Sequence, residues 1–209
     1  MKNIILLILL ITLYNCAGTN SYKVSKKAVS IGSNINLEGG VGVASFADDP
    51  LALNETDYES LEQKVSLDVG FKIGSLIISA EAGNIYNDFQ KQVYDPTVEG
   101  DYRIDEEFSA TTKFKRVNLI KKYNLDGDGL AYYSLQLFYD AELESTFHDL
   151  PNSSNRTIEG TGRGYQLNLN FPVFYMGFGQ NWREYELSDE SVFKMEEFYL
   201  QIGFNLVLI

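Results

Sequence analysis

The sequence predicts an all-β fold in which eight antiparallel strands close into an up-and-down barrel. Apolar and polar residues alternate through most of the chain, which is the period of a β-strand. Glycine, tyrosine and phenylalanine are abundant, with 17, 14 and 13 copies, and the aromatic residues favour strands. Short and long connections follow one another between the alternating segments, as expected when successive strands run up and down.

The beginning of the chain has the pattern of a secretory signal peptide. Lys2 precedes about ten apolar residues, 4–13, and this combination is typical of secretion signals. We therefore expect a signal peptide over 1–17, a tether over 18–30 and a barrel over 31–209. The segment from Leu13 to Cys16 also resembles a lipobox, which would make Cys16 a lipidated N-terminus. Both forms of processing carry the protein out of the cytoplasm.

Each strand is expected from its alternation, in chain order. The expected strands are 31–46, 61–73, 76–87, 108–123, 130–146, 165–171, 173–185 and 198–209. Gly74 and Ser75 form a two-residue hairpin turn, and 124–129 and Pro172 mark the other short connections. The long connections are 48–60, 88–107, 147–160 and 186–192.

The last strand shows the two faces clearly. Phe198, Leu200 and Ile202 fall on one face, and Tyr199 and Gln201 fall on the other. Strand 108–123 is the exception, because its apolar phase shifts between Phe114 and Val117. We expect a β-bulge at Lys115–Arg116, since one extra residue exchanges the faces.

The polar face determines which side of the barrel meets lipid. It carries many glycines, which weaken strands and serve little purpose on a surface in water. The narrow interior of eight strands has room for few side chains, so glycines suit it. The apolar face is then outside, as in a membrane barrel. The charges expected inside are Lys64, Asp68, Lys72, Glu81, Lys113, Lys115, Asp140, Glu142, Glu144, Arg183 and Glu197.

These interior charges should form cross-strand ion pairs, because buried charges are costly unless paired. We expect the pairs to close the lumen. Aromatic residues near strand ends should form the interface girdles of a membrane protein. The girdle candidates are Tyr132, Tyr133, Tyr175, Trp182 and Tyr185.

The end of the chain resembles the C-terminal recognition signal of bacterial outer-membrane β-barrels. Gln201, Gly203, Leu206 and Leu208 fill its polar, glycine and apolar positions, although the chain ends one residue later, at Ile209. With its eight strands, the chain resembles the small outer-membrane barrels of the OmpA, OmpX and OmpW kind. The resemblance implies a monomer in the bacterial outer membrane, with membrane lipid, lipopolysaccharide and the barrel-assembly machinery as partners.

Two motifs suggest chemistry but have simpler explanations. Asp126 to Gly129 resembles the start of a calcium loop, yet the later ligands are missing and these residues are usual in turns. His148 with Ser153 and Ser154 resembles the residues of lipid A-modifying barrels, but Leu150 stands where that pattern has serine. We expect no metal, cofactor or catalytic site.

The charge balance limits the partners. A formal net charge of −12 excludes nucleic acid as an expected partner, because phosphate binding needs a basic surface. The acidic loops could bind divalent cations or a basic external partner.

We expect a non-enzymatic outer-membrane barrel with an envelope-structural or surface-contact role through its acidic loops. The alternatives are a lipid-modifying barrel enzyme with His148 as base, and a secreted soluble barrel that binds a small hydrophobic ligand.

Overall fold

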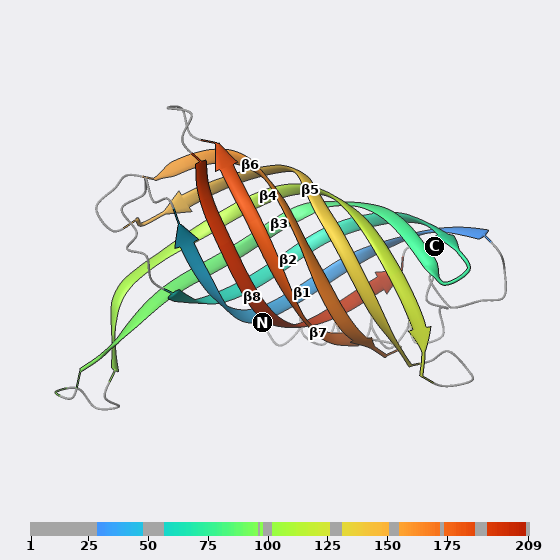
Figure 1. The fold of residues 1–209 in the computed structure, drawn as a ribbon, viewed down its shortest axis with the longest axis horizontal. Coiled ribbons are helices and arrows are strands. Elements are labelled where there is room, and N and C mark those ends of the chain that lie inside the picture. Colours follow the sequence, from blue (N-terminus) through green and yellow to red (C-terminus); the bar gives the residue numbers. More distant parts are fainter. Residues whose placement is uncertain are drawn as a thin grey trace, which may run out of the picture.

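A computed structural model describes residues 29–47, 57–95, 97, 102–125, 131–150, 155–171, 174–186 and 192–207. Within these residues eight strands form a closed barrel (Figure 1). This confirms the predicted all-β, up-and-down antiparallel architecture. The expected signal peptide, Cys16 and most of the tether lie outside the described residues. The strands are β1 (Val29–Ala47), β2 (Asp57–Ile73), β3 (Leu76–Tyr94), β4 (Tyr102–Asn124), β5 (Tyr132–His148), β6 (Arg156–Asn170), β7 (Phe174–Glu186) and β8 (Val192–Val207).

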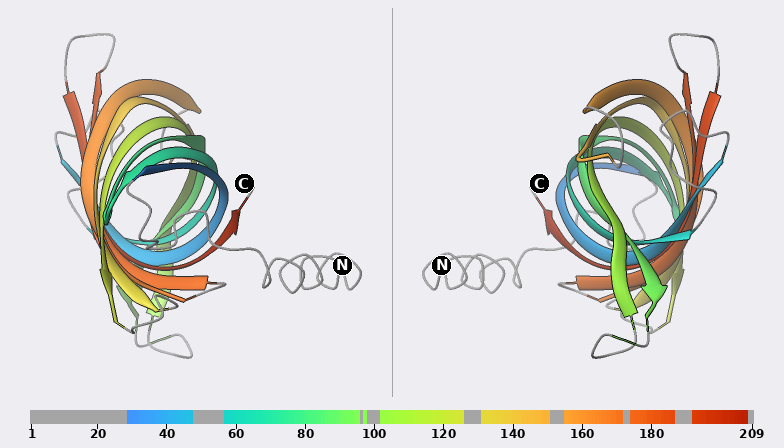
Figure 2. Two further views of the ribbon diagram at one scale, coloured as in Figure 1. Left: turned by 90° about the vertical axis from the view of Figure 1, so that its right-hand side faces the viewer. Right: turned by 90° about the vertical axis from the view of Figure 1, so that its left-hand side faces the viewer.

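The barrel closes through the first and last strands. Each strand pairs antiparallel with its neighbours in the chain, and β1 also pairs with β8, from Asn34 opposite Val207 to Ala47 opposite Lys194. Figure 2 shows the strands curving around one interior. Closure removes open sheet edges from the wall. Among the described residues, no helix is long and apolar enough to cross a bilayer.

The Gly74–Ser75 turn and the ends of two further hairpins lie at one end of the barrel, called the turn end below. Gly74 has a φ of +60°, which glycine adopts without steric cost, and it lies with Ser75 between β2 and β3 as predicted. The backbone N–H of Leu125 donates to the carbonyl of Ala131 (3.0 Å) after β4. The N–H of Phe171 donates to the carbonyl of Phe174 (2.8 Å) after β6.

At the opposite end, the loop end, the strands are longer than predicted. The expected loop 88–107 is mostly strand, because β3 continues to Tyr94 and β4 begins at Tyr102. The β3–β4 hairpin reaches beyond the other strands (Figure 1). β6 begins at Arg156 rather than at 165, and β8 begins at Val192 rather than at 198.

The outward alternation in β4 differs from the prediction. Even-numbered residues face the interior without interruption from Phe108 to Asn118. Phe108 and Phe114 are therefore buried inside, although the sequence suggests that they share the outer face with Val117. The interior is itself apolar at the loop end, so these phenylalanines need no bulge in β4.

The bulge lies in β5, opposite the predicted position. Lys115 pairs with Glu142 and Arg116 pairs with Asp140, which leaves Ala141 as the extra residue. The neighbouring ladder with β6 is also irregular at this point. The inward positions of β5 are even-numbered up to Asp140 and odd-numbered from Leu143 onward. Ala141 and Glu142 both face outward.

The outer wall carries an apolar belt from the turn end to beyond mid-height. A wall with apolar residues outside and polar residues inside is that of a transmembrane β-barrel. Large apolar side chains are exposed here, since no other described segment covers them. The belt includes Val41, Val43, Leu61, Val65, Leu67, Val69, Phe71, Ile73, Ile78, Val117, Leu119, Leu135, Leu137, Met176, Phe178, Phe198, Leu200, Ile202 and Phe204.

The polarity reverses towards the loop end. There the interior is filled by an apolar cluster, the aromatic plug, in which Phe46 lies 5.4 to 5.7 Å, ring centre to ring centre, from Tyr58, Phe89, Phe108 and Phe193. The outer surface of the same strand segments carries Asp57, Glu59, Asp88, Glu159, Glu184, Glu186, Lys194 and Glu196. The plug consists of Ala44, Phe46, Tyr58, Ile85, Phe89, Phe108, Ala110, Phe114, Leu143, Phe147, Leu150, Ile158, Tyr185, Phe193 and Met195.

Glycines make room for large side chains that lie against the wall. Gly179 pairs with Tyr199 across β7 and β8, and a Cβ at Gly179 would lie 2.6 Å from Tyr199 Cζ. Tyr175 covers Gly203 and Phe138 covers Gly164 in the same way. Each aromatic ring thus occupies the space that a side chain on the next strand would need.

We predict that Gly179→Ala destabilises the barrel, because the new methyl group would overlap both Tyr199 and the backbone carbonyl of Tyr165, 2.6 Å away. Overpacking of this kind costs about 1–3 kcal/mol. The control is Gly39→Ala on the outer face, where the nearest atom to an added Cβ is 4.0 Å away. Urea unfolding in detergent micelles measures the free energy of unfolding of both variants. Equal values would contradict the close packing of Tyr199 on Gly179.

Candidate functional site

The candidate site is the lumen, where the buried charged residues of the described strands lie. Seven of the charged residues expected inside are buried there in the structure. Two of them lie towards the turn end, Asp68 and Lys72, and the amine of Lys72 has no hydrogen-bond partner among the described residues. The buried set is Lys64, Asp68, Lys72, Glu81, Asp140, Arg183 and Glu197.

Four charges expected inside lie outside instead. Lys113 bonds Glu144 at 2.7 Å and Lys115 bonds Glu142 at 2.6 Å on the outer surface of β4 and β5. The two lysines face outward because β4 keeps its phase through the predicted bulge. The two glutamates face outward because the bulge in β5 exchanges its faces.

Two buried cations, Arg116 and Lys122, were not predicted from the sequence to lie inside the barrel, and neither was Glu62. Uninterrupted alternation along β4, read from Phe108, would have placed both cations inside. Arg116 binds Asp140 through two hydrogen bonds, Nε to Oδ1 at 2.6 Å and Nη2 to Oδ2 at 3.1 Å. Its guanidinium also lies 3.8 Å from the ring centre of Phe138, a favourable cation–π position.

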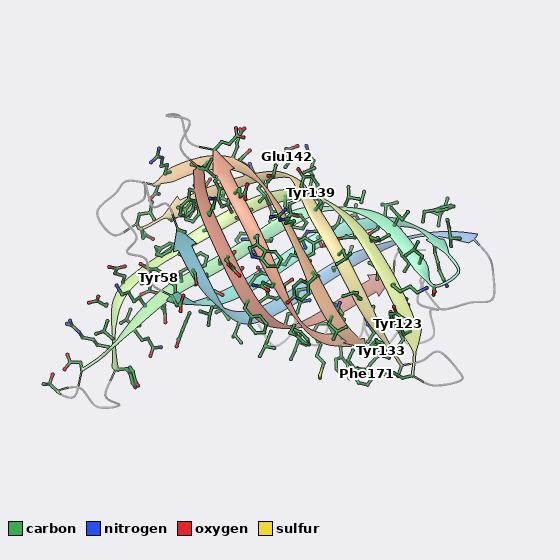
Figure 3. All side chains as sticks on the ribbon, viewed as in Figure 1. Tyr58, Tyr123, Tyr133, Tyr139, Glu142 and Phe171 are labelled. Atoms are coloured by element: carbon green, nitrogen blue, oxygen red, sulfur yellow. The ribbon has the colours of Figure 1, made fainter. Side chains whose placement is uncertain are left out.

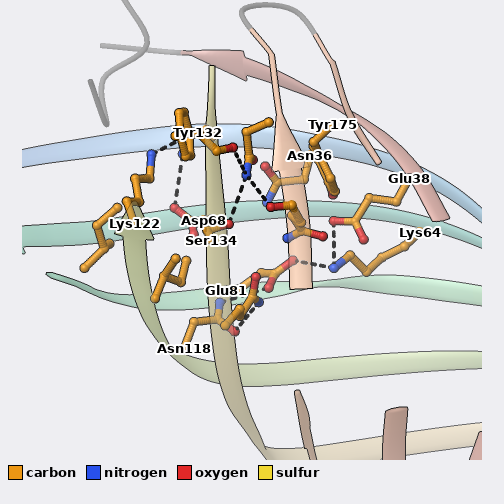
Figure 4. Close-up of a pocket in the computed structure, with 16 residues that line it drawn as sticks. Asn36, Glu38, Lys64, Asp68, Glu81, Asn118, Lys122, Tyr132, Ser134 and Tyr175 are labelled. Carbon is orange, nitrogen blue, oxygen red and sulfur yellow. Dashed lines mark hydrogen bonds and ion pairs between the residues drawn. The ribbon is translucent and has the colours of Figure 1, made fainter. Parts of the chain in front are cut away.

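Lys64 connects two strands on either side of β2. Its amine lies 2.8 Å from Glu38 Oε1 and 3.1 Å from Glu81 Oε1. Asn118 Nδ2 donates to Glu81 Oε2 at 3.0 Å, and the Ser66 hydroxyl donates to the same carboxylate. Figure 4 shows Lys64 between the two glutamates. The buried charges of Lys64, Glu38 and Glu81, called the Lys64 layer below, are therefore compensated by ion pairs and by hydrogen bonds together.

Arg183 lies against the aromatic plug, with its Nη1 4.0 Å from the sulfur of Met195. Its Nη2 lies 3.6 Å from Glu62 Oε2 and 3.9 Å from Glu197 Oε2. Glu197 also accepts hydrogen bonds from the Ser60 hydroxyl (2.6 Å) and from Asn181 Nδ2 (3.2 Å). Most of these buried ion pairs join adjacent strands, whereas the pair of Arg183 on β7 with Glu62 on β2 reaches across the lumen.

A small polar cavity lies between the Lys64 layer and the turn end. Its volume is about 70 Å³, which suits a few water molecules rather than an organic ligand. Lys122 donates to the Tyr132 hydroxyl at 2.8 Å on its wall. Figure 4 shows Tyr132, Ser134 and Asp68 around the same space.

The aromatic girdle differs from its prediction at three positions. Tyr132, Tyr175 and Tyr185 are buried inside the barrel, because their strands turn these positions to the lumen. Tyr133 faces outward and stacks on Tyr123 with ring centres 5.0 Å apart. Figure 3 shows this pair near Phe171, at the end of the barrel opposite Tyr58. Trp182 also faces outward, near Tyr165.

The residues singled out for chemistry are not brought together in the part of the chain that the structure describes. His148 Nδ1 lies 3.3 Å from the side-chain amide of Asn155. Ser153, Ser154 and the segment 126–129 lie outside the described residues. No group of three or more metal-ligating side chains was found among the residues described.

The structure shows what surrounds two residues of the expected assembly signal. Gln201 is buried in the lumen, and Gly203 lies beneath Tyr175. Leu206 is part of β8, and Leu208 lies outside the described residues.

No protein-family model and no curated protein matches the chain. Among solved structures, Neisserial surface protein A (NspA) is 11% identical over 85% of this chain and 99% of that chain, with a TM-score of 0.49. Ail, the attachment invasion locus protein of Yersinia pestis, is 12% identical over 84% of this chain and 99% of that chain, with a TM-score of 0.37. These likenesses concern the fold alone.

Two neighbouring cations on opposite faces of β4 test the value of the interior pairs. We predict that Arg116→Met destabilises the barrel by about 3–5 kcal/mol, because Asp140 would remain buried without its partner. Lys115→Met should cost about 0–1 kcal/mol, because its pair with Glu142 is exposed. Denaturant unfolding in lipid vesicles measures the difference. Similar losses would show that Arg116 is solvated in the lumen.

Proposed function

We propose that this chain is a non-enzymatic β-barrel of the bacterial outer membrane, with an envelope-structural or surface-contact role. The observation that carries the proposal is the reversal of polarity along the barrel axis. Towards the turn end, apolar side chains face outward around a polar lumen, which suits lipid. Towards the loop end, charged side chains face outward around the aromatic plug, which suits water.

The interior supports a sealed barrel rather than a pore. Eight strands leave an interior that side chains can fill. Here the ion pairs of Lys64, Arg116 and Arg183 lie on the turn-end side of the aromatic plug. Polar side chains therefore fill one part of the lumen, and aromatic side chains fill the part next to it.

The orientation follows from the two ends. Outer-membrane barrels have short turns on the periplasmic side and longer loops outside. The turn end would therefore face the periplasm, and the acidic loop end would face the exterior. The outer-membrane lipid and lipopolysaccharide would surround the belt, and the end of β8 would engage the barrel-assembly machinery.

An enzymatic role has less support. His148 contacts Asn155, whose amide is not a nucleophile. A soluble ligand-binding barrel would need its apolar face inside along the whole axis. Here the lumen towards the turn end holds charged and amide side chains instead.

Cell fractionation with gel mobility tests the proposal. The protein should be recovered with the outer membrane and should migrate as a compact species in detergent unless boiled. Recovery in the soluble periplasm, or mobility that boiling does not change, would refute it.

Two outward substitutions on β8 locate the membrane boundary. Leu200→Arg should prevent insertion, because a cation on the lipid face costs about 2–4 kcal/mol at the bilayer midplane. Glu196→Arg, four residues closer to the loop end on the same face, should insert normally. The amount of heat-modifiable protein in the outer-membrane fraction measures both. Equal tolerance would place the belt elsewhere.

The sealed lumen predicts an absence of conductance. Purified protein in planar bilayers should give no steady single-channel current, because ion pairs and aromatic rings fill the path. Sustained large currents would show an open lumen and would replace the structural role with a channel.

A further inference from the structure

The β3–β4 hairpin continues beyond its neighbours as a two-stranded ribbon. The pairing of β3 with β2 extends to Gln90, opposite Glu59, and the pairing of β4 with β5 begins at Ser109, opposite His148. Further out, β3 and β4 pair with each other as far as Tyr94 and Tyr102. Figure 1 shows this ribbon projecting past the other strands.

The outer side of β4 in the ribbon is a strand edge. Around Arg103, Ile104 and Glu107 the strand has β3 on one side, and no strand of the described chain pairs with its other side. Such an edge is a template for another extended chain. Asp105 is an extra residue that shifts the register with β3, and irregularities of this kind hinder indiscriminate pairing.

Exposed apolar side chains on the ribbon also indicate a contact surface. Tyr102 is 58% exposed and Ile104 is 52% exposed, and both lie far from the apolar belt. Two residues apart on one strand, they project to the same side. Exposed apolar side chains outside the belt are typical of surfaces that contact other proteins.

The acidic charge of the ribbon favours a basic partner. Its two cations are already occupied, since Lys91 lies 3.7 Å from Glu106, and Arg103 lies 3.6 Å from both Asp95 and Asp105. Thr97 donates its hydroxyl and its N–H to Asp95, which lowers the pKa of that carboxyl and keeps it ionised.

More carboxylates lie at the base of the ribbon. Glu59, Asp88 and Glu107 lie at the ribbon end of a groove of about 530 Å³, whose other end is lined by belt residues such as Leu61 and Leu200. A second copy of this chain would bring acidic edges together, and like charges opposite each other destabilise strand pairs. A basic partner would instead meet opposite charges.

We propose that the β4 edge of the ribbon binds an extended basic polypeptide segment as an added strand. Backbone hydrogen bonds would provide pairing, alternate apolar residues would cover Tyr102 and Ile104, and lysine or arginine residues would meet the carboxylates. This inference rests on the proposed function, since the ribbon meets external polypeptides only when the loop end faces outward.

The probe is a fluorescent eight-residue peptide of alternating lysine and valine, tested by anisotropy against the full chain in lipid nanodiscs. Saturable binding is expected. A peptide with glutamate in place of lysine should not bind. A basic peptide with proline at alternate positions should also fail, because proline removes the backbone donors. Equal binding of the proline peptide would overturn strand addition.

Matched charge reversals distinguish the ribbon from the general acidity of the protein. Asp105→Lys with Glu107→Lys should weaken binding about tenfold, because local pairs become repulsive. Glu184→Lys with Glu186→Lys makes the same change in net charge on β7 and should weaken binding less than twofold. Equal effects, or dimerisation of the unliganded protein through the ribbon in sedimentation, would refute the proposal. Failure to bind in a protein that still fractionates with the outer membrane would refute this inference alone.

Discussion

The narrow width of the lumen is the constraint on which the rest of the structure depends. An eight-stranded barrel has space for its own side chains and little else, so every inward position must fit those on the neighbouring strands. Tyr175 fits because Gly203 lies opposite, and Tyr199 fits because Gly179 lies opposite. The same lack of space brings Arg183 on β7 within 3.6 Å of Glu62 on β2, although β8 and β1 lie between these strands. Packing and charge pairing are therefore two results of one geometric limit.

The reversal of polarity along the axis explains how one wall can serve two environments. The hydrogen-bonded frame of the strands is continuous from the turn end to the loop end. What changes is which face carries apolar residues, and in β5 the bulge at Ala141 contributes to that change by turning Leu143 inward and Glu142 outward. The proposed surface role depends on this arrangement, because the strands themselves, rather than the loops alone, carry acidic residues beyond the membrane.

Alternation in the sequence was sufficient to predict the strands and faces within the apolar belt. In β2, β7 and β8 the outward residues are those that the pattern indicates, since lipid outside and polar groups inside give a clear contrast. The same reading failed near the loop end. There Phe108 and Phe114 look like lipid-facing residues, but they belong to an apolar interior. Alternation shows that two faces differ, and it does not show which face points inward. The misplacement of Lys113 and Lys115 and the omission of Arg116 both follow from that ambiguity.

The position of Trp182 has a consequence for spectroscopy. It is the chain's single tryptophan, and it faces outward on β7 between Phe178 in the belt and Glu184 in the charged zone. An indole prefers such a boundary between apolar and wet surroundings. Intrinsic fluorescence therefore reports from one depth on one strand. A quencher carried by lipid headgroups would reach this indole more readily than one at the ends of the acyl chains.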